Sequence, residues 1–167
     1  MSFTAKDVAA LREKTGCGMM DCKKALTESA GDVDKAIEYL REKGLAAAAK
    51  KADRIASEGV VAALSENGRA VLIEVNSETD FVSKNEEFQK FVAGCAKAVL
   101  DSDADTVEQL LTASFGGAGT VEEALREKIL TIGENLKIRR FVKYSGVTES
   151  YIHGGGRIGV LCAFDTD

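Results

Sequence analysis

The dipeptide Asn67-Gly68 lies between two segments rich in Val, Leu and Ile, and it constrains the fold more than any other feature of the chain. Asn-Gly is the strongest short signal for the two-residue turn of a β-hairpin, because both residues tolerate a positive φ. Residues 58–65 and 69–77 are therefore predicted to be antiparallel strands. Apolar residues occupy alternate positions along the second strand, as expected where one face of a sheet is buried.

Residues 5–43 have a helical period instead, and they predict three short amphipathic helices. Thr4 and Asp7 are spaced like a capping box at the start of the first helix. Asp32 is a suitable N-cap for the third helix, and Gly44 stands where its C-cap is expected. The Ala- and Lys-rich segment that follows has no broad apolar face and is predicted to be a linker.

Further helices and strands are predicted downstream of the hairpin. Ser83 and Glu86 have capping-box spacing before a helix with an apolar face, and Thr120 and Glu123 repeat that spacing before another. The remaining predicted elements are a short helix at 106–113 and strands at 136–144 and 158–164.

The charge balance and the cysteines exclude several classes of protein. The 167 residues include 22 basic and 27 acidic side chains, and the resulting net charge of −5 is unfavourable for binding nucleic acid through its phosphates. No apolar run approaches the ~20 residues that a membrane helix needs. The N-terminus has no export or transit signal, and the four cysteines lack C-x-x-C spacing. We therefore expect a cytoplasmic protein with free thiols and no direct contact with nucleic acid or membranes.

Features that could indicate an enzyme or a metal site are weak. Residues 154–159 match G-x-G-x-x-G, but they precede a strand and open no helix, so we predict a glycine-rich connection between strands. His153 is the only histidine, and the sequence offers it neither a nucleophile nor an orienting partner. Residues 101–112 begin like a calcium loop, but Thr106 and Thr112 replace its Gly and Glu. We expect no catalytic residue, no metal, no cofactor, and a protein that is not an enzyme.

Met19 and Met20 are the first residues of the second predicted helix. Because adjacent residues of a helix point in different directions, the two methionines cannot both lie on its apolar face. Met19 is predicted to join the buried stripe of Cys22 and Leu26, whereas Met20 falls on a row of lysines that faces water. The sequence leaves open whether an exposed Met20 is incidental or belongs to a contact surface, for which the adaptable methionine side chain is well suited.

The segment Thr79-Asp80-Phe81-Val82 lies between the end of a predicted strand and Ser83. A loop at this place should be polar, yet two apolar side chains follow a carboxylate. Val82 fits the buried position that precedes a helix N-cap. Phe81 is either buried under the hairpin or exposed as a rigid anchor for a partner, and the residues alone leave both alternatives open.

Two long segments carry a resemblance to a known family. Residues 11–26, LREKTGCGMMDCKKAL, are similar to the N-terminal signature of the translation elongation factor Ts family. Residues 74–84, EVNSETDFVSK, resemble the second signature of that family. The resemblance extends over essentially the whole chain, and the other similar segments are 132–135 with Arg139 and Arg140, and 151–154 with 157–161.

The resemblance implies an α+β fold, with an N-terminal three-helix bundle similar to a ubiquitin-associated (UBA) domain. An α+β core with an antiparallel sheet, built from a hairpin and helices, would follow. The implied organisation is a UBA-like domain at 1–45, a linker at 46–56, a first core subdomain at 57–145 and the start of a second at 146–167. Members of the family normally continue beyond the last predicted strand, so the chain is expected to lack the C-terminal part.

The resemblance also implies a function in protein biosynthesis. This function is guanine-nucleotide exchange on the GTPase elongation factor Tu, with GDP release promoted by displacement of Mg²⁺. The residues that correspond to the Mg²⁺-displacing segment of the family are Thr79, Asp80, Phe81 and Val82. The residues expected to contact the partner are Met19, Met20 and His153. For the longer form, the resemblance leaves open a homodimer or a 2:2 complex.

Two other functions compete with exchange. A UBA-like interaction module without exchange activity would use residues 1–45 and leave residues 79–82 without a role. A nucleotide-dependent enzyme built on the glycine-rich segment near His153 is disfavoured by the context of that segment. Binding to elongation factor Tu without faster GDP release would favour the interaction module.

Overall fold

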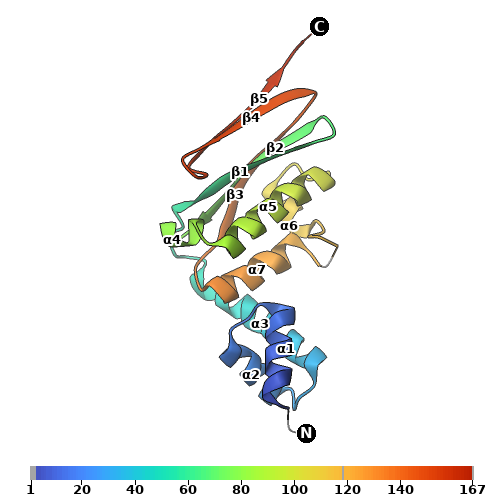
Figure 1. The fold of residues 1–167 in the computed structure, drawn as a ribbon, viewed down its shortest axis with the longest axis vertical. Helices are drawn as coiled ribbons and strands as arrows, with labels where there is room; N and C mark the ends of the chain where they lie inside the picture. Colours follow the sequence, from blue (N-terminus) through green and yellow to red (C-terminus); the bar gives the residue numbers. More distant parts are fainter. Residues whose placement is uncertain (1–2, 118, 167) are drawn as a thin grey trace. The chain divides into compact units, whose positions relative to one another are not determined.

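The computed structural model describes residues 3–117 and 119–166 and divides the chain into two compact units. One unit contains the residues up to 53 together with 126–133, and the other contains 54–125 together with the residues from 134 onward. Helices and antiparallel sheets are both present, as Figure 1 shows, and the predicted α+β fold class is confirmed.

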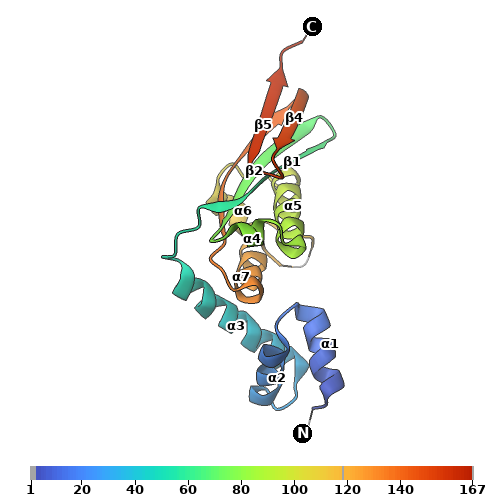
Figure 2. The ribbon, with the colours of Figure 1, turned by 60° about the vertical axis from the view of Figure 1, so that its left-hand side comes forward.

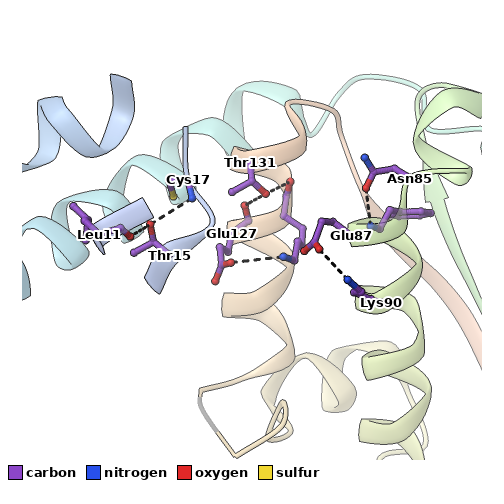
Figure 3. Close-up of polar contacts among 10 residues, drawn as sticks. Leu11, Thr15, Cys17, Asn85, Glu87, Lys90, Glu127 and Thr131 are labelled. Carbon is purple, nitrogen blue, oxygen red and sulfur yellow. Dashed lines mark hydrogen bonds and ion pairs between the residues drawn. The ribbon is translucent and has the colours of Figure 1, made fainter. Parts of the chain in front are cut away.

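The first unit contains α1 (Ala5–Thr15), α2 (Met19–Glu28) and α3 (Val33–Lys51). The predicted capping box of Thr4 and Asp7 is present, and the Asp32 carboxylate caps α3 as predicted. At the end of α1, the Thr15 hydroxyl donates to the Leu11 carbonyl and accepts from the backbone N–H of Cys17 (Figure 3). The buried core of the bundle consists of Val8, Leu11, Cys17, Cys22, Ala25, Leu26, Ala36 and Leu40.

Helix α3 continues through Gly44, so the predicted end of the helix at this glycine is wrong. A Cβ at Gly44 would lie 3.5 Å from the backbone oxygen of Arg126, which is ordinary van der Waals contact, so the surroundings of this position do not require a glycine. The helix extends to Lys51 because Ala and Lys have high helix propensity. The first part of the predicted linker at 46–56 is therefore helical, and the domain boundaries remain a prediction.

The second unit is built on a three-stranded antiparallel sheet of β1 (Glu58–Glu66), β2 (Arg69–Ser77) and β3 (Lys137–Ser145), in the order β1-β2-β3. The predicted hairpin is confirmed, since β1 pairs with β2 through a turn in which Asn67 has φ 52° and Gly68 has φ 72°. These positive angles are those of the type I′ turn that Asn-Gly favours.

Helix α5 (Glu86–Asp101) packs on the sheet and contributes eight buried residues to the core. Its buried residues include Phe88, Phe91, Val92, Cys95 and Val99. The predicted cap at Ser83 is wrong. The Asn85 side chain accepts from the backbone N–H of Phe88 (Figure 3), while the Ser83 hydroxyl donates to the Asp80 carbonyl of the preceding turn. Two further helices are α6 (Val107–Thr112) and α7 (Val121–Ile132), and the predicted Thr120–Glu123 capping box precedes α7.

A second hairpin of β4 (Val147–His153) and β5 (Ile158–Phe164) covers the face of the β1–β2 sheet opposite α5 (Figures 1 and 2). The sequence had not predicted β4. Residues 154–157 form the turn of this hairpin, which agrees with the predicted glycine-rich connection. The Gly156 carbonyl accepts from the backbone N–H of Val61 at 2.7 Å, so the turn is joined to β1.

Candidate functional site

The segment from Thr79 to Val82 leaves the end of β2 and forms α4 (Asp80–Ser83), a single turn of helix before α5. The two apolar side chains of this turn have opposite environments. Phe81 is 80% exposed, whereas Val82 is 8% exposed. The alternative in which both residues are buried as core is therefore excluded. The aromatic ring of Phe81 is thus exposed to solvent, while the adjacent Val82 side chain fixes the turn to the core.

Thr79 is the residue that fixes this turn to the rest of the unit. Its backbone N–H donates to Glu134 Oε2 at 3.0 Å, and its hydroxyl donates to Glu134 Oε1 at 2.6 Å. Its carbonyl accepts from the hydroxyl of Ser77, which is fully buried. Thr79 occupies the N-cap position of α4, but its side chain makes no capping hydrogen bond. Its backbone N–H and its hydroxyl both bond to Glu134, which is 55 residues later, so the position that precedes Asp80 and Phe81 is anchored by tertiary contacts.

Glu78 and Asn135 add two further hydrogen bonds between the same two loops, and the one donated by Asn135 runs in the opposite direction. The Glu78 backbone N–H donates to Glu134 Oε2 at 3.0 Å, and Glu78 Oε1 accepts from the backbone N–H of Asn135 at 2.6 Å. Asn135 is 7% exposed, and its side-chain amide donates to the carbonyl of Arg54. The Arg54 guanidinium lies 3.4 Å from Glu78 Oε1. We call Arg54, Glu78, Glu134 and Asn135 the loop network.

The sequence assigned no role to any residue of the loop network. Glu134 and Asn135 belong to a segment that resembles the family, but nothing local couples them to Thr79, which is 55 residues earlier. The sequence holds only an indirect signal for this network. Glu78 directly follows the predicted strand at 69–77, and Glu134 lies just before the predicted strand at 136–144. Carboxylates at such loop positions readily accept hydrogen bonds from backbone N–H groups.

Asp80 presents a carboxylate beside the exposed ring. Its Oδ2 lies 3.1 Å from Nζ of Lys84, one turn later; the Lys84 side chain is largely open to solvent and that of Asp80 is half-buried. Because exposed pairs of this kind interact weakly, Lys84 holds the Asp80 carboxylate loosely. The negative charge is therefore available to an approaching surface.

Met19 and Met20 lie at the start of α2 in the first unit, and the prediction for Met19 was wrong. Met19 is 50% exposed and Met20 is 72% exposed, so the predicted exposure of Met20 is confirmed. Cys17, which is 2% exposed, takes the core position that the stripe had assigned to Met19. Helix α2 begins only at Met19, so no preceding helical turn covers this residue, and the loop that carries Cys17 turns inward.

His153 ends β4, and its ring nitrogen Nδ1 lies 2.9 Å from the hydroxyl of Tyr151. Both rings are exposed, with centroids 5.9 Å apart. The predicted histidine is thus a surface residue with an aromatic neighbour. Among the described residues, no hydrogen bond or ion pair joins it to residues 79–82.

The thiols do not form a reactive or metal-binding cluster. Burial raises the pKa of the Cys95 thiol strongly and is also the main cause of the raised pKa of Cys17, so both stay protonated at neutral pH. Cys162 on β5 is exposed. Within residues 3–117 and 119–166, no group of three or more His, Cys, Asp or Glu side chains is arranged to hold a metal ion. None of the helices described in that range is long and apolar enough to span a bilayer.

Comparison with known proteins identifies relatives over nearly the whole chain. The family model described as elongation factor TS matches residues 78–167, which includes Thr79 to Val82 and the loop of Glu134. Elongation factor Ts of Clostridium perfringens strain 13 is 56% identical over 164 residues, and that of Clostridium botulinum strain Alaska E43 is 55% identical. Each alignment covers 95% of this chain and 54% of the relative, so the chain spans about half the length of the curated relatives that it matches.

Proposed function

Because the chain belongs to the elongation factor Ts family, we propose that it acts in translation elongation as a guanine-nucleotide exchange factor for the GTPase elongation factor Tu. The observation that carries the proposal is the 80% exposure of Phe81 on a turn that Thr79 anchors. The proposed site of action is the cytoplasm, and the proposed role requires no catalytic residue, metal or cofactor of the chain itself.

Nucleotide exchange makes and breaks no covalent bond, so it requires a shaped surface rather than an acid, a base or a nucleophile. A GTPase holds GDP mainly through its phosphates and a Mg²⁺ ion, which is the largest local charge in such a site. A protein that binds best to a geometry without Mg²⁺ weakens nucleotide binding. Linkage requires the nucleotide to weaken the binding of that protein by the same factor, so incoming GTP releases it again.

Phe81 is the proposed wedge. Its ring would insert between elements of the partner and displace the segment that coordinates Mg²⁺. Thr79 is anchored before the ring and Val82 is buried after it, so the free energy of contact is used to deform the partner rather than the turn. Asp80 would compete for a hydrogen bond or a water molecule in the Mg²⁺ shell.

Met20, with Met19, is the proposed second contact, and His153 a third. The two methionines belong to the first unit, whereas Phe81 belongs to the second. When one contact has formed, the covalent connection raises the effective concentration of the other, so two weak contacts give a stable complex. Exposed methionine suits such a surface because its flexible thioether adapts to the shape of a partner.

The test measures release of a fluorescent GDP analogue from elongation factor Tu in a stopped-flow instrument. Phe81→Ala is expected to lower the apparent second-order rate constant of release about 30-fold, since truncating an anchor of this kind costs about 2 kcal/mol. Phe164→Ala is the matched control, because Phe164 is another exposed phenylalanine, on β5, and it should change the rate less than twofold.

Two outcomes would reject parts of the proposal. An unchanged rate for Phe81→Ala would reject Phe81 as the wedge. Binding of the unmodified chain to elongation factor Tu without acceleration of GDP release would reject exchange activity and favour the UBA-like interaction module, whose exposed Met20 would then be the principal contact.

A further inference from the structure

We propose that Glu134 is the positioning residue of the exchange site: its carboxylate holds residues 78 and 79 so that Phe81 is presented in one conformation. The inference rests on the proposed function and extends it to a residue in a distant part of the chain. Glu134 lies between α7 and β3, whereas Phe81 lies between β2 and α5.

Three hydrogen bonds converge on the Glu134 carboxylate from two consecutive residues. Oε2 accepts from the backbone N–H groups of Glu78 and Thr79, each at 3.0 Å, and Oε1 accepts from the Thr79 hydroxyl at 2.6 Å. An ionised carboxylate offers only acceptors, so it matches a site that presents three donors. Bonds to a charged acceptor are also shorter and stronger than those between neutral groups.

The short length of α4 makes such an anchor necessary. A helix of four residues does not persist on its own, because one turn fixes several dihedral angles for very few hydrogen bonds. The Thr79 hydroxyl, which could have capped α4, bonds to Glu134 instead. The direction of the turn therefore depends on the tertiary anchor at residues 78 and 79 and on the buried side chain of Val82.

The loop network fixes Glu134 in turn. The backbone N–H of the following residue, Asn135, donates to Glu78 Oε1 at 2.6 Å, so the two loops exchange hydrogen bonds in both directions. The buried Asn135 side chain donates to the Arg54 carbonyl at 2.8 Å. A carboxylate held in this way transmits its own position to the backbone that carries Phe81.

Glu134→Gln is the sharpest perturbation, because the amide has the shape of the carboxylate but one acceptor oxygen is replaced by an NH₂ donor. That donor faces at least one of the three donors of residues 78 and 79. Thr79→Val is a milder variant that removes only the hydroxyl donor. Glu123→Gln is the matched control, since the Glu123 carboxylate accepts a backbone N–H at 2.9 Å in the capping box of α7.

A double-mutant cycle measures whether Glu134 acts through Phe81. Glu134→Gln should lower the rate constant for GDP release from elongation factor Tu about 10-fold, and Thr79→Val about 3-fold. In the Phe81→Ala background, each should change the remaining rate less than twofold. Glu123→Gln should leave the rate within twofold of that of the unmodified chain. Equal factors in both backgrounds, or no effect of Glu134→Gln, would overturn the proposal.

A second measurement does not depend on exchange activity. The chain contains no tryptophan, so Phe81→Trp introduces a single fluorophore at the turn. An exposed side chain rotates on the ps–ns timescale in any case, so the readout is the difference between variants: the amplitude of the fast component in time-resolved anisotropy should rise clearly when Glu134→Gln is added. Unchanged local motion would reject the positioning role. If the unmodified chain fails to accelerate GDP release, the proposed function is rejected, and the anisotropy result still decides whether Glu134 positions residue 81.

Discussion

Gly59 is the position at which a single methyl group should be most damaging to the sheet. It lies in β1 opposite Asn76 of β2, with φ +133°. A Cβ built there would lie 2.2 Å from the carbonyl oxygen of Val75 and 2.6 Å from Cα of Asn76. Both neighbours are backbone atoms, so no side chain can rotate away. Gly68 in the hairpin turn has φ +72°, and a Cβ there would meet nothing within 4 Å.

The two glycines separate backbone strain from steric overlap. An L-residue at a positive φ costs about 1–2 kcal/mol, and the reduced freedom of the unfolded chain returns about 0.4–1 kcal/mol. Gly68→Ala should therefore lower the free energy of unfolding by at most about 1.6 kcal/mol. Relief of the overlap at Gly59 requires β1 and β2 to separate locally, with loss of ladder hydrogen bonds worth about 1 kcal/mol each. Gly59→Ala should therefore lower the free energy of unfolding by about 3–5 kcal/mol.

Urea unfolding followed by tyrosine fluorescence measures the difference. The protein has three tyrosines, and a Tyr39→Phe background leaves only Tyr144 and Tyr151, which report on the second unit alone. In this background Gly59→Ala should unfold at a clearly lower urea concentration than Gly68→Ala, with an unchanged slope. If the free energies of unfolding of the two variants differ by less than about 1 kcal/mol, the argument that steric overlap at Gly59 destabilises the sheet is refuted.

Three further predictions concern the contact surface, the thiols and the start of α5. Met20→Ala should weaken the complex with elongation factor Tu about 10-fold in a titration without altering unfolding, because Met20 is 72% exposed; an equal loss of stability would contradict this. At pH 8, Cys162 should react rapidly with a thiol reagent and Cys95 only after unfolding, because burial raises the pKa of the Cys95 thiol and keeps it protonated; fast labelling of Cys95, located by mass spectrometry, would refute this. Asn85→Ala should lower the free energy of unfolding by about 1 kcal/mol, as expected for loss of an N-cap, and more than Ser83→Ala in a parallel urea titration.

Local chemistry determined the elements that the sequence predicted well. The Asn67-Gly68 turn and the capping boxes that begin at Thr4 and Thr120 each depend on residues within a few positions of one another, and all three are confirmed. The exposure of Met20 also followed from its place on a helical row, and the family resemblance is borne out by the matching family model.

Each error has a physical cause that the capping and periodicity patterns do not contain. Helix α3 continues through Gly44 because the Ala- and Lys-rich residues that follow it have high helix propensity. Ser83 does not cap α5 because its hydroxyl satisfies the turn before it, and Asn85 takes that place. Met19 is exposed because no turn of α2 precedes it. The roles of Thr79 to Val82, of the two methionines and of His153 in binding a partner, and the domain boundaries, stay predictions.

The order of synthesis has a consequence for the helical bundle, because one of its pieces is made late. Leu130 packs against the cluster formed by residues 8–40, and residues 126–133 belong to the same compact unit. At a translation rate of about 5–20 residues per second, this piece emerges roughly 4–15 s after residue 53. During this interval the part of the bundle that Leu130 covers stays exposed to solvent. The bundle can complete its folding only after most of the sheet-containing unit has been synthesised.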